Sequence, residues 1–183
     1  MKVKERKHKE IGVILGELSQ PQLIELMEEL CSLNEDVLLF LRTRLMNSSV
    51  SIEPYRKKIC SAFRVDPMYN EELEWHAADR AVEQYRMAAD DEEGLAELFV
   101  LYVKEANDYT LEYGDIDEAY YEVMEESFQK AVDHLLCMRE KRKNIDRFIK
   151  DLRGVVRSTS GIGWGYHDAL SEMFYEAFGG CDE

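Results

Sequence analysis

The chain has 183 residues, of which 45% are hydrophobic and 33% charged, and its formal net charge is −15. This composition is that of a globular chain long enough to bury a core, and it excludes a disordered polymer. The excess of negative charge argues against nucleic acid and anionic membranes as partners, because both present phosphate groups.

The pattern of apolar residues and cysteines favours a cytoplasmic protein. No apolar run approaches the ~20 residues that span a bilayer, so no membrane association is expected. The basic first nine residues are not followed by the apolar segment of a secretory signal. The four cysteines form no CxxC pair, so free thiols are expected, with a pair of disulfides as the alternative. We therefore expect a cytoplasmic protein without a cofactor.

Apolar residues recur at helical spacing along the chain, and no convincing strand pattern is present. Residues 1–18 are expected to form a basic N-terminal segment that can be flexible. Ser19 to Gln22 read as a capping box with an early proline, and Asn34 can cap a second helix, which together predict a helical hairpin. Further helices are expected to begin near residues 51, 70, 91, 115, 139 and 166, and 158–183 should form a glycine-rich turn and a terminal helix.

These starts group into pairs of about 35 to 45 residues, the size of a helical repeat unit. The sequence therefore predicts an all-α fold of about eight helices. Its architecture is expected to be stacked antiparallel helical hairpins, as an irregular bundle or a short helical-repeat-like array. One helical domain is expected to span residues 1–183.

The segment 113–121 joins a turn, a helix start, three carboxylates and three tyrosines. Gly114 is expected to end one helix in a left-handed conformation, and Asp115 to cap the next helix with Glu118 reaching back. Capping of this kind accounts for the carboxylates. The alternative is a site for a cation or a basic side chain formed by Asp115, Asp117 and Glu118. The segment lacks the EF-hand pattern, so calcium is not predicted.

The segment before the last predicted helix has three alternating glycines between residues 161 and 165. We interpret it as a tight turn that packs Trp164 and Tyr166 against the preceding helix. The alternative is a binding loop that uses Trp164, Tyr166 and His167. The spacing matches neither GxGxxG after a strand nor a GxxxxGK loop, so nucleotide binding is not predicted.

Histidines offer no clear catalytic pattern. Glu72, His76 and Asp79 share one helix face, but HExxH is absent and a single helix cannot complete a metal site. An exposed ion-pair face explains the spacing. No catalytic residue is assigned, and no metal site is predicted.

Three motifs resemble those of uncharacterised, all-helical bacterial proteins of similar length. They are a leucine-rich opening hairpin at 22–26, a Tyr-Arg-Lys-Lys-Ile segment at 55–59 and Tyr-Gly-Asp-Ile-Asp-Glu at 113–118. The resemblance covers residues 19–136. It implies a helical-hairpin fold and no known activity.

Charge is uneven along the chain. Residues 66–133 contain 21 acidic and 4 basic side chains, whereas residues 139–157 contain 8 basic and 3 acidic ones. An acidic, tyrosine-rich helical surface suits a basic protein partner. We therefore expect a non-enzymatic protein-interaction role, with binding residues Tyr113, Asp115, Asp117, Tyr120, Tyr121, Trp164, Tyr166 and His167. The alternative is a small metal- or anion-dependent enzyme that uses His76 or His167 with carboxylates from different helices.

Overall fold

The computed structural model describes residues 2–46, 52–65, 73–114 and 116–179. These residues form nine α-helices and no strand, which confirms the predicted all-α class with about eight helices. The chain divides into two compact units, Met1–Asn47 (unit 1) and Ser48–Glu183 (unit 2), each of which is described by itself. The single domain expected from the sequence remains a prediction.

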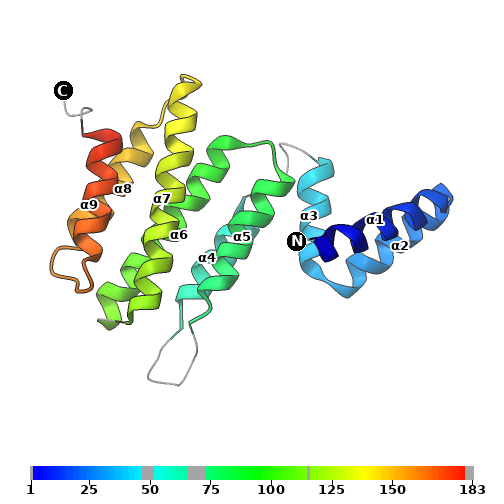
Figure 1. Ribbon diagram of the computed structural model, residues 1–183, viewed down its shortest axis with the longest axis horizontal. Coiled ribbons are helices and arrows are strands. Elements are labelled where there is room, and N and C mark those ends of the chain that lie inside the picture. The colour runs from blue at the N-terminus through cyan, green and yellow to red at the C-terminus, as the bar shows by residue number, and fades with distance from the viewer. Residues whose placement is uncertain (1, 47–51, 66–72, 115, 180–183) are drawn as a thin grey trace. The chain divides into compact units, whose positions relative to one another are not determined.

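Unit 1 consists of three helices (Figure 1): α1 (Lys2–Glu17), α2 (Gln20–Leu33) and α3 (Glu35–Met46). The first was not predicted, because residues 1–18 were interpreted as a basic segment. The other two pack as the expected hairpin. At the start of α2, the Gln22 Oε1 atom accepts hydrogen bonds from the Ser19 N–H at 2.9 Å and from the Ser19 hydroxyl at 2.7 Å. The Asn34 side chain accepts from the Asp36 N–H at 2.7 Å, so both predicted helix starts are confirmed.

Unit 2 contains the remaining helices (Figure 1): α4 (Glu53–Phe63), α5 (Trp75–Ala88), α6 (Glu92–Tyr113), α7 (Glu118–Glu140), α8 (Asp146–Ser158) and α9 (Tyr166–Phe178). Helix α6 is central, because α4, α5, α7 and α8 all pack against it. Helix α9 packs on both α7 and α8. The successive pairs α4–α5 and α6–α7 are hairpins, as the sequence predicted.

The core of unit 2 is rich in aromatic side chains. Aromatic rings bury large areas, so they contribute much of the free energy that holds these helices together. Eight rings are less than 2% exposed: Tyr55, Tyr102, Tyr120, Tyr121, Phe128, Tyr166, Phe174 and Phe178. Five of the eight are tyrosines, so the core also contains hydroxyl groups that need hydrogen-bond partners.

Helix ends in unit 2 test the predicted boundaries. The carboxylate of Asp91 caps α6 by accepting from the Gly94 N–H at 3.0 Å, as expected. The last helix begins at Tyr166, also as expected. The helix predicted to begin near residue 70 begins at Trp75 instead. Residues 51 and 70 themselves lie outside the described residues.

The boundary predicted near Arg139 is wrong. Helix α7 continues to Glu140, and α8 begins only at Asp146. The reason is a helix-ending turn in which Arg142 has φ 60° and the Lys143 N–H donates to the Met138 carbonyl at 3.0 Å. This is the bonding of a Schellman motif, in which the left-handed residue ends the helix.

Candidate functional site

The turn between α6 and α7 differs in one respect from the predicted capping. Gly114 has φ 87° and ends α6, as expected. The cap of α7 is Asp117, whose carboxylate accepts from the Tyr120 N–H at 2.8 Å, so the predicted capping box from Asp115 to Glu118 is wrong. Asp117 has the extended backbone that an N-cap requires. Asp115 lies outside the described residues.

A buried hydroxyl network fixes this turn. The Thr110 hydroxyl donates to the Gly114 carbonyl at 3.1 Å, so the Tyr121 hydroxyl, 2.6 Å from Thr110 Oγ1, donates to that oxygen. The Tyr121 oxygen also accepts from the Ile116 N–H at 3.4 Å. One tyrosine on α7 therefore holds both the end of α6 and the residue that follows the turn.

Three of the predicted binding residues, Tyr120, Tyr121 and Tyr166, belong to the core. They are 0%, 1% and 1% exposed, so their rings offer no surface to a macromolecular partner. The Tyr120 hydroxyl donates to the Ala106 carbonyl at 2.6 Å. Burial raises the pKa of Tyr120 and of Tyr166, so both stay neutral near physiological pH.

The two candidate segments of the sequence meet through these buried rings. The centroids of Tyr121, just after the α6–α7 turn, and Tyr166, at the start of α9, are 5.0 Å apart. Figure 1 shows the loop before α9 and the α6–α7 turn at the same end of unit 2. The turn between α6 and α7 and the start of α9 are therefore in contact through core packing of these two rings.

Two predicted binding residues, Tyr113 and Trp164, are exposed at this end. Tyr113 is 37% exposed and its ring lies 4.8 Å from that of Tyr109, whereas Trp164 is 54% exposed. Trp164 has φ 59°, a left-handed conformation that non-glycine residues rarely adopt. The loop therefore holds a large aromatic side chain at the surface in a strained backbone.

The other predicted residues have defined structural partners. Asp117 is exposed, but its carboxylate caps α7. His167 is half-buried and its Nδ1 lies 2.8 Å from Thr159 Oγ1. Because the Thr159 hydroxyl donates to the Val156 carbonyl at 2.7 Å, His167 Nδ1 is the donor in that contact. His167 thus ties α9 to the end of α8.

The basic segment that the sequence revealed after residue 139 pairs with the N-terminal half of α6. Both Lys141 and Lys143 contact the Glu92 carboxylate, the latter at 2.6 Å, and hydrogen bonds from these two side chains lower the pKa of Glu92 to about 2. Arg147 pairs with Glu93 at 2.7 Å. Positive charge from the end of α7 and from α8 is therefore used within unit 2.

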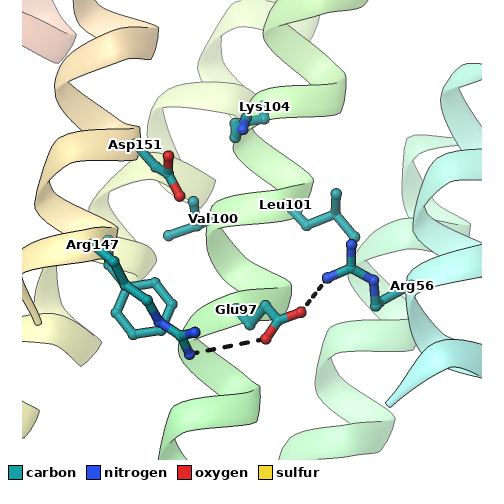
Figure 2. Close-up of a pocket in the computed structure, with 8 residues that line it drawn as sticks. Arg56, Glu97, Val100, Leu101, Lys104, Arg147 and Asp151 are labelled. Carbon is teal, nitrogen blue, oxygen red and sulfur yellow. Dashed lines mark hydrogen bonds and ion pairs between the residues drawn. The ribbon is translucent and has the colours of Figure 1, made fainter. Parts of the chain in front are cut away.

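Figure 2 shows a groove of ≈ 260 Å³ between α4, α6 and α8 that continues this pattern. Glu97 of α6 lies between Arg56 of α4, which contacts it directly, and Arg147 of α8, at 4.0 Å. The Arg147 guanidinium also stacks on Phe148, 4.5 Å from the ring centroid. Both arginines are occupied, so the groove links three helices and leaves no open anion site between them.

The part of α6 after Lys104 and the first half of α7 carry no basic side chain. Residues 105–129 contain nine acidic side chains and no lysine, arginine or histidine. We call the described carboxylates of this stretch the acidic end. They form no ion pair with another described residue, although Glu105 accepts a hydrogen bond from the Cys60 thiol at 3.3 Å and Asp117 caps α7. The members of the acidic end are Glu105, Asp108, Glu112, Asp117, Glu118, Glu122, Glu125 and Glu126.

Two pKa shifts show the effect of this imbalance. Partial burial, and then the charge of Glu105, raises the pKa of Asp108, and the charge of Lys104 offsets part of this rise. Partial burial, and then the charge of Glu122, raises the pKa of Glu125. The negative charge of Glu125 in turn contributes to the raised pKa of Tyr166, which places that carboxylate beside the start of α9. The sequence reasoning singled out the aspartates of the turn and missed Glu122 and Glu125, although the uninterrupted acidic stretch was a readable signal.

His76 and His167, the two histidines named in the enzymatic alternative, lie in different surroundings. His76 is exposed on α5, where its ring lies 5.3 Å from that of Trp75, whereas His167 contacts Thr159. Among the described residues, no group of three or more His, Cys, Asp or Glu side chains is arranged to hold a metal ion. Glu72 lies outside those residues. No described helix is both long enough and apolar enough to cross a membrane.

No protein-family model, curated protein or solved structure matches the chain. Its class therefore follows from the fold and the surface alone. It is an all-α protein of helical hairpins. One end of unit 2 combines an exposed tryptophan with carboxylates that form no ion pair with the other described residues.

Proposed function

We propose that the acidic end of unit 2, together with Trp164, binds a basic segment of a partner protein and performs no reaction of its own. One observation carries the proposal: the carboxylates of the N-terminal half of α6 are paired with lysine and arginine, whereas those of the acidic end form no ion pair within the part of the chain that the structure describes. The unpaired charge is concentrated where two sequence-distant segments meet.

The raised pKa values of Asp108 and Glu125 support a cationic ligand. A carboxylate that is disfavoured in its ionised form by burial and by a like charge gains stability when a positive group approaches. Such attraction mainly speeds association and selects for basic partners, since a single exposed ion pair contributes only about 0.5 kcal/mol. A second source of affinity is therefore required.

Trp164 supplies it. Tryptophan is among the residues that most often dominate binding energy at interfaces, and its ring face attracts lysine and arginine. A non-glycine residue in the left-handed region costs on the order of 1 kcal/mol, so the ring is presented at some expense of stability. The loop that carries Trp164 leads directly into the buried, mutually packed rings of Tyr121 and Tyr166. Such packing restricts the motion of neighbouring residues, which limits the conformational entropy lost on binding.

Binding of an octa-arginine peptide tests the proposal, with amide chemical shifts followed in the full-length protein. We expect shifts to map to residues 105–126 and 160–168 and to weaken with salt. The double variant Glu122→Gln/Glu125→Gln should bind about fivefold more weakly, because it removes two ion pairs to the peptide that each contribute about 0.5 kcal/mol. Trp164→Gly should also weaken binding while relieving the strained φ.

The matched control is Glu172→Gln/Glu176→Gln, which removes the same charge from exposed positions on α9. Its affinity should stay within about twofold of the wild type, since simple loss of net charge acts weakly at moderate salt. Equal weakening in both double variants, or shifts that map to another surface, would reject the proposed site.

A further inference from the structure

Unit 2 contains a line of aromatic rings that can each be oxidised. Trp75 of α5 lies 6.1 Å from Tyr120 of α7, measured between ring centroids, and Tyr120 lies 6.3 Å from Tyr109 of α6. Tyr109 in turn lies 4.8 Å from Tyr113, at the end of the same helix. Centroids less than about 7 Å apart are typical of aromatic rings in contact. The four rings therefore form an unbroken line, which we call the aromatic path.

The aromatic path crosses the core and ends at the surface. Trp75, its first ring, is half-buried, and the next two rings, Tyr120 and Tyr109, are buried. Tyr113, the last ring, is 37% exposed. Rings in contact exchange electrons, so an electron hole, which is the loss of one electron from a ring, can pass from Trp75 through the core to Tyr113.

Release of a proton decides on which ring the hole remains. A tyrosine ring that has lost an electron is a strong acid, and its radical persists once the hydroxyl proton has left. The Tyr120 hydroxyl donates to the Ala106 carbonyl at 2.6 Å, and a neutral carbonyl is too weak a base to take that proton. At Tyr113, which borders the solvent, water takes the proton. The hole therefore remains at Tyr113.

Packing by itself does not require phenol rings on this path. Phenylalanine fills nearly the same space and brings no hydroxyl group that must find a partner inside the core. A phenol ring, unlike a phenyl ring, gives up one electron to oxidants of moderate strength. Tyr121 and Tyr166 extend the oxidisable core to α9, because Tyr121 lies 5.4 Å from Tyr120 and 5.0 Å from Tyr166. A hole on either ring can reach Tyr120 and then follow the aromatic path.

We propose that the aromatic path carries one-electron oxidation from Trp75 to Tyr113, where a radical forms and is repaired at the surface. An oxygen-centred radical takes one electron from the Trp75 ring and is reduced to its anion. An electron from Tyr113 restores the Trp75 ring, and the Tyr113 hydroxyl proton passes to water. The phenoxyl radical then takes one electron from a diffusible thiolate and one proton from water, which restores tyrosine and leaves a thiyl radical. This role is independent of the proposed binding function.

Pulse radiolysis of the full chain tests the proposal, with the azide radical as oxidant because it oxidises indole rings in preference to phenols. Trp164→Phe serves as the reference protein, since Trp75 is then the one tryptophan in the sequence. The absorbance of the oxidised indole should decay as that of the phenoxyl radical grows, at a rate independent of protein concentration. A nitroso spin trap should then be found on Tyr113 by peptide mass spectrometry. A transfer rate proportional to protein concentration, or a trap found on other tyrosines and not on Tyr113, would overturn the proposal.

Tyr109→Phe, added to the reference protein, interrupts the path but keeps a ring at that position. The oxidised indole should then persist, and most of the phenoxyl signal should be lost. The matched control is Tyr175→Phe, which removes a 53% exposed tyrosine whose ring contacts Phe174, a ring that the hole does not enter. It should leave the rate and the phenoxyl yield unchanged. Far-ultraviolet circular dichroism checks that both variants keep their helices. If the rates and yields of the two folded variants were equal, the path through Tyr109 would be excluded.

Discussion

The hydroxyl of Tyr121 provides the sharpest test of how the two candidate segments are held together. Tyr121→Phe removes the bond donated to Thr110 Oγ1 and the bond accepted from the Ile116 N–H, but it keeps the ring between Tyr120 and Tyr166. Packing is thereby preserved, so the change in unfolding free energy reports the hydrogen bonds alone.

The magnitude follows from the geometry. A buried neutral hydrogen bond contributes about 1 kcal/mol net, and the 2.6 Å contact with Thr110 is of this kind. The bond from Ile116 is long at 3.4 Å and involves a half-buried residue, so we assign it about half as much. Thr110 still donates to the Gly114 carbonyl, so it is not left unsatisfied. The expected loss is therefore about 1.5 kcal/mol.

Urea denaturation followed by tryptophan fluorescence measures this loss in the relevant unit, because both tryptophans, Trp75 and Trp164, lie in unit 2. With a urea slope of about 2 kcal/mol/M, the midpoint should fall by about 0.7 M. Tyr175→Phe, which removes a hydroxyl from a 53% exposed ring, should move the midpoint by less than about 0.2 M.

A double-mutant cycle with Thr110→Val isolates the central contact. If the two hydroxyls interact as described, the double variant should lose about 1 kcal/mol less than the sum of the single variants. Additive losses, or a midpoint for Tyr121→Phe equal to that of Tyr175→Phe, would refute the proposed network.

Three further predictions concern strain and ionisation. Arg142→Gly should raise the unfolding free energy by about 1 kcal/mol in the same urea assay, because φ 60° costs arginine more than glycine; destabilisation would contradict this interpretation of the α7 end. Because folding raises the pKa of Glu125, the wild type loses stability as the pH rises through the range of that shift. Glu125→Gln should therefore be more stable than the wild type at about pH 7 but not at about pH 3. An equal difference in stability at both pH values would exclude the shift. Burial raises the pKa of Tyr102 to about 12, so its contribution to stability is present below about pH 10 and lost above it. An absorbance titration should therefore show fewer tyrosines ionising near pH 10 in the native protein than in guanidinium, and identical titrations would contradict the buried core.

Local signals explain which parts of the fold were predictable. The caps at Ser19 and Asn34, the helix start near residue 91, the left-handed Gly114 and the start of α9 at Tyr166 were correctly placed, because each depends on residues within one helical turn. The first helix was missed because its basic residues do not form an amphipathic pattern with a clear cap.

Competing local signals explain the errors. Asp115 and Asp117 can each cap a helix, and the selected cap is the one that lets Tyr121 reach both Thr110 and Ile116 across the turn. The boundary of α8 was placed too early because residues near 139–143 are good helix formers, whereas Arg142 ends α7 in a left-handed turn.

The sequence by itself determined the all-α class, most helix ends and the separation of acidic from basic segments, because apolar spacing, caps and charge are local properties of the chain. Only the tertiary structure decided that Tyr120, Tyr121 and Tyr166 are core residues while Trp164 is exposed. It also decided that the basic segment pairs with the first half of α6, whereas the acidic end forms no ion pair with the other described residues. Both outcomes depend on which helices pack together, and such contacts join residues 45 to 54 positions apart that no local pattern connects.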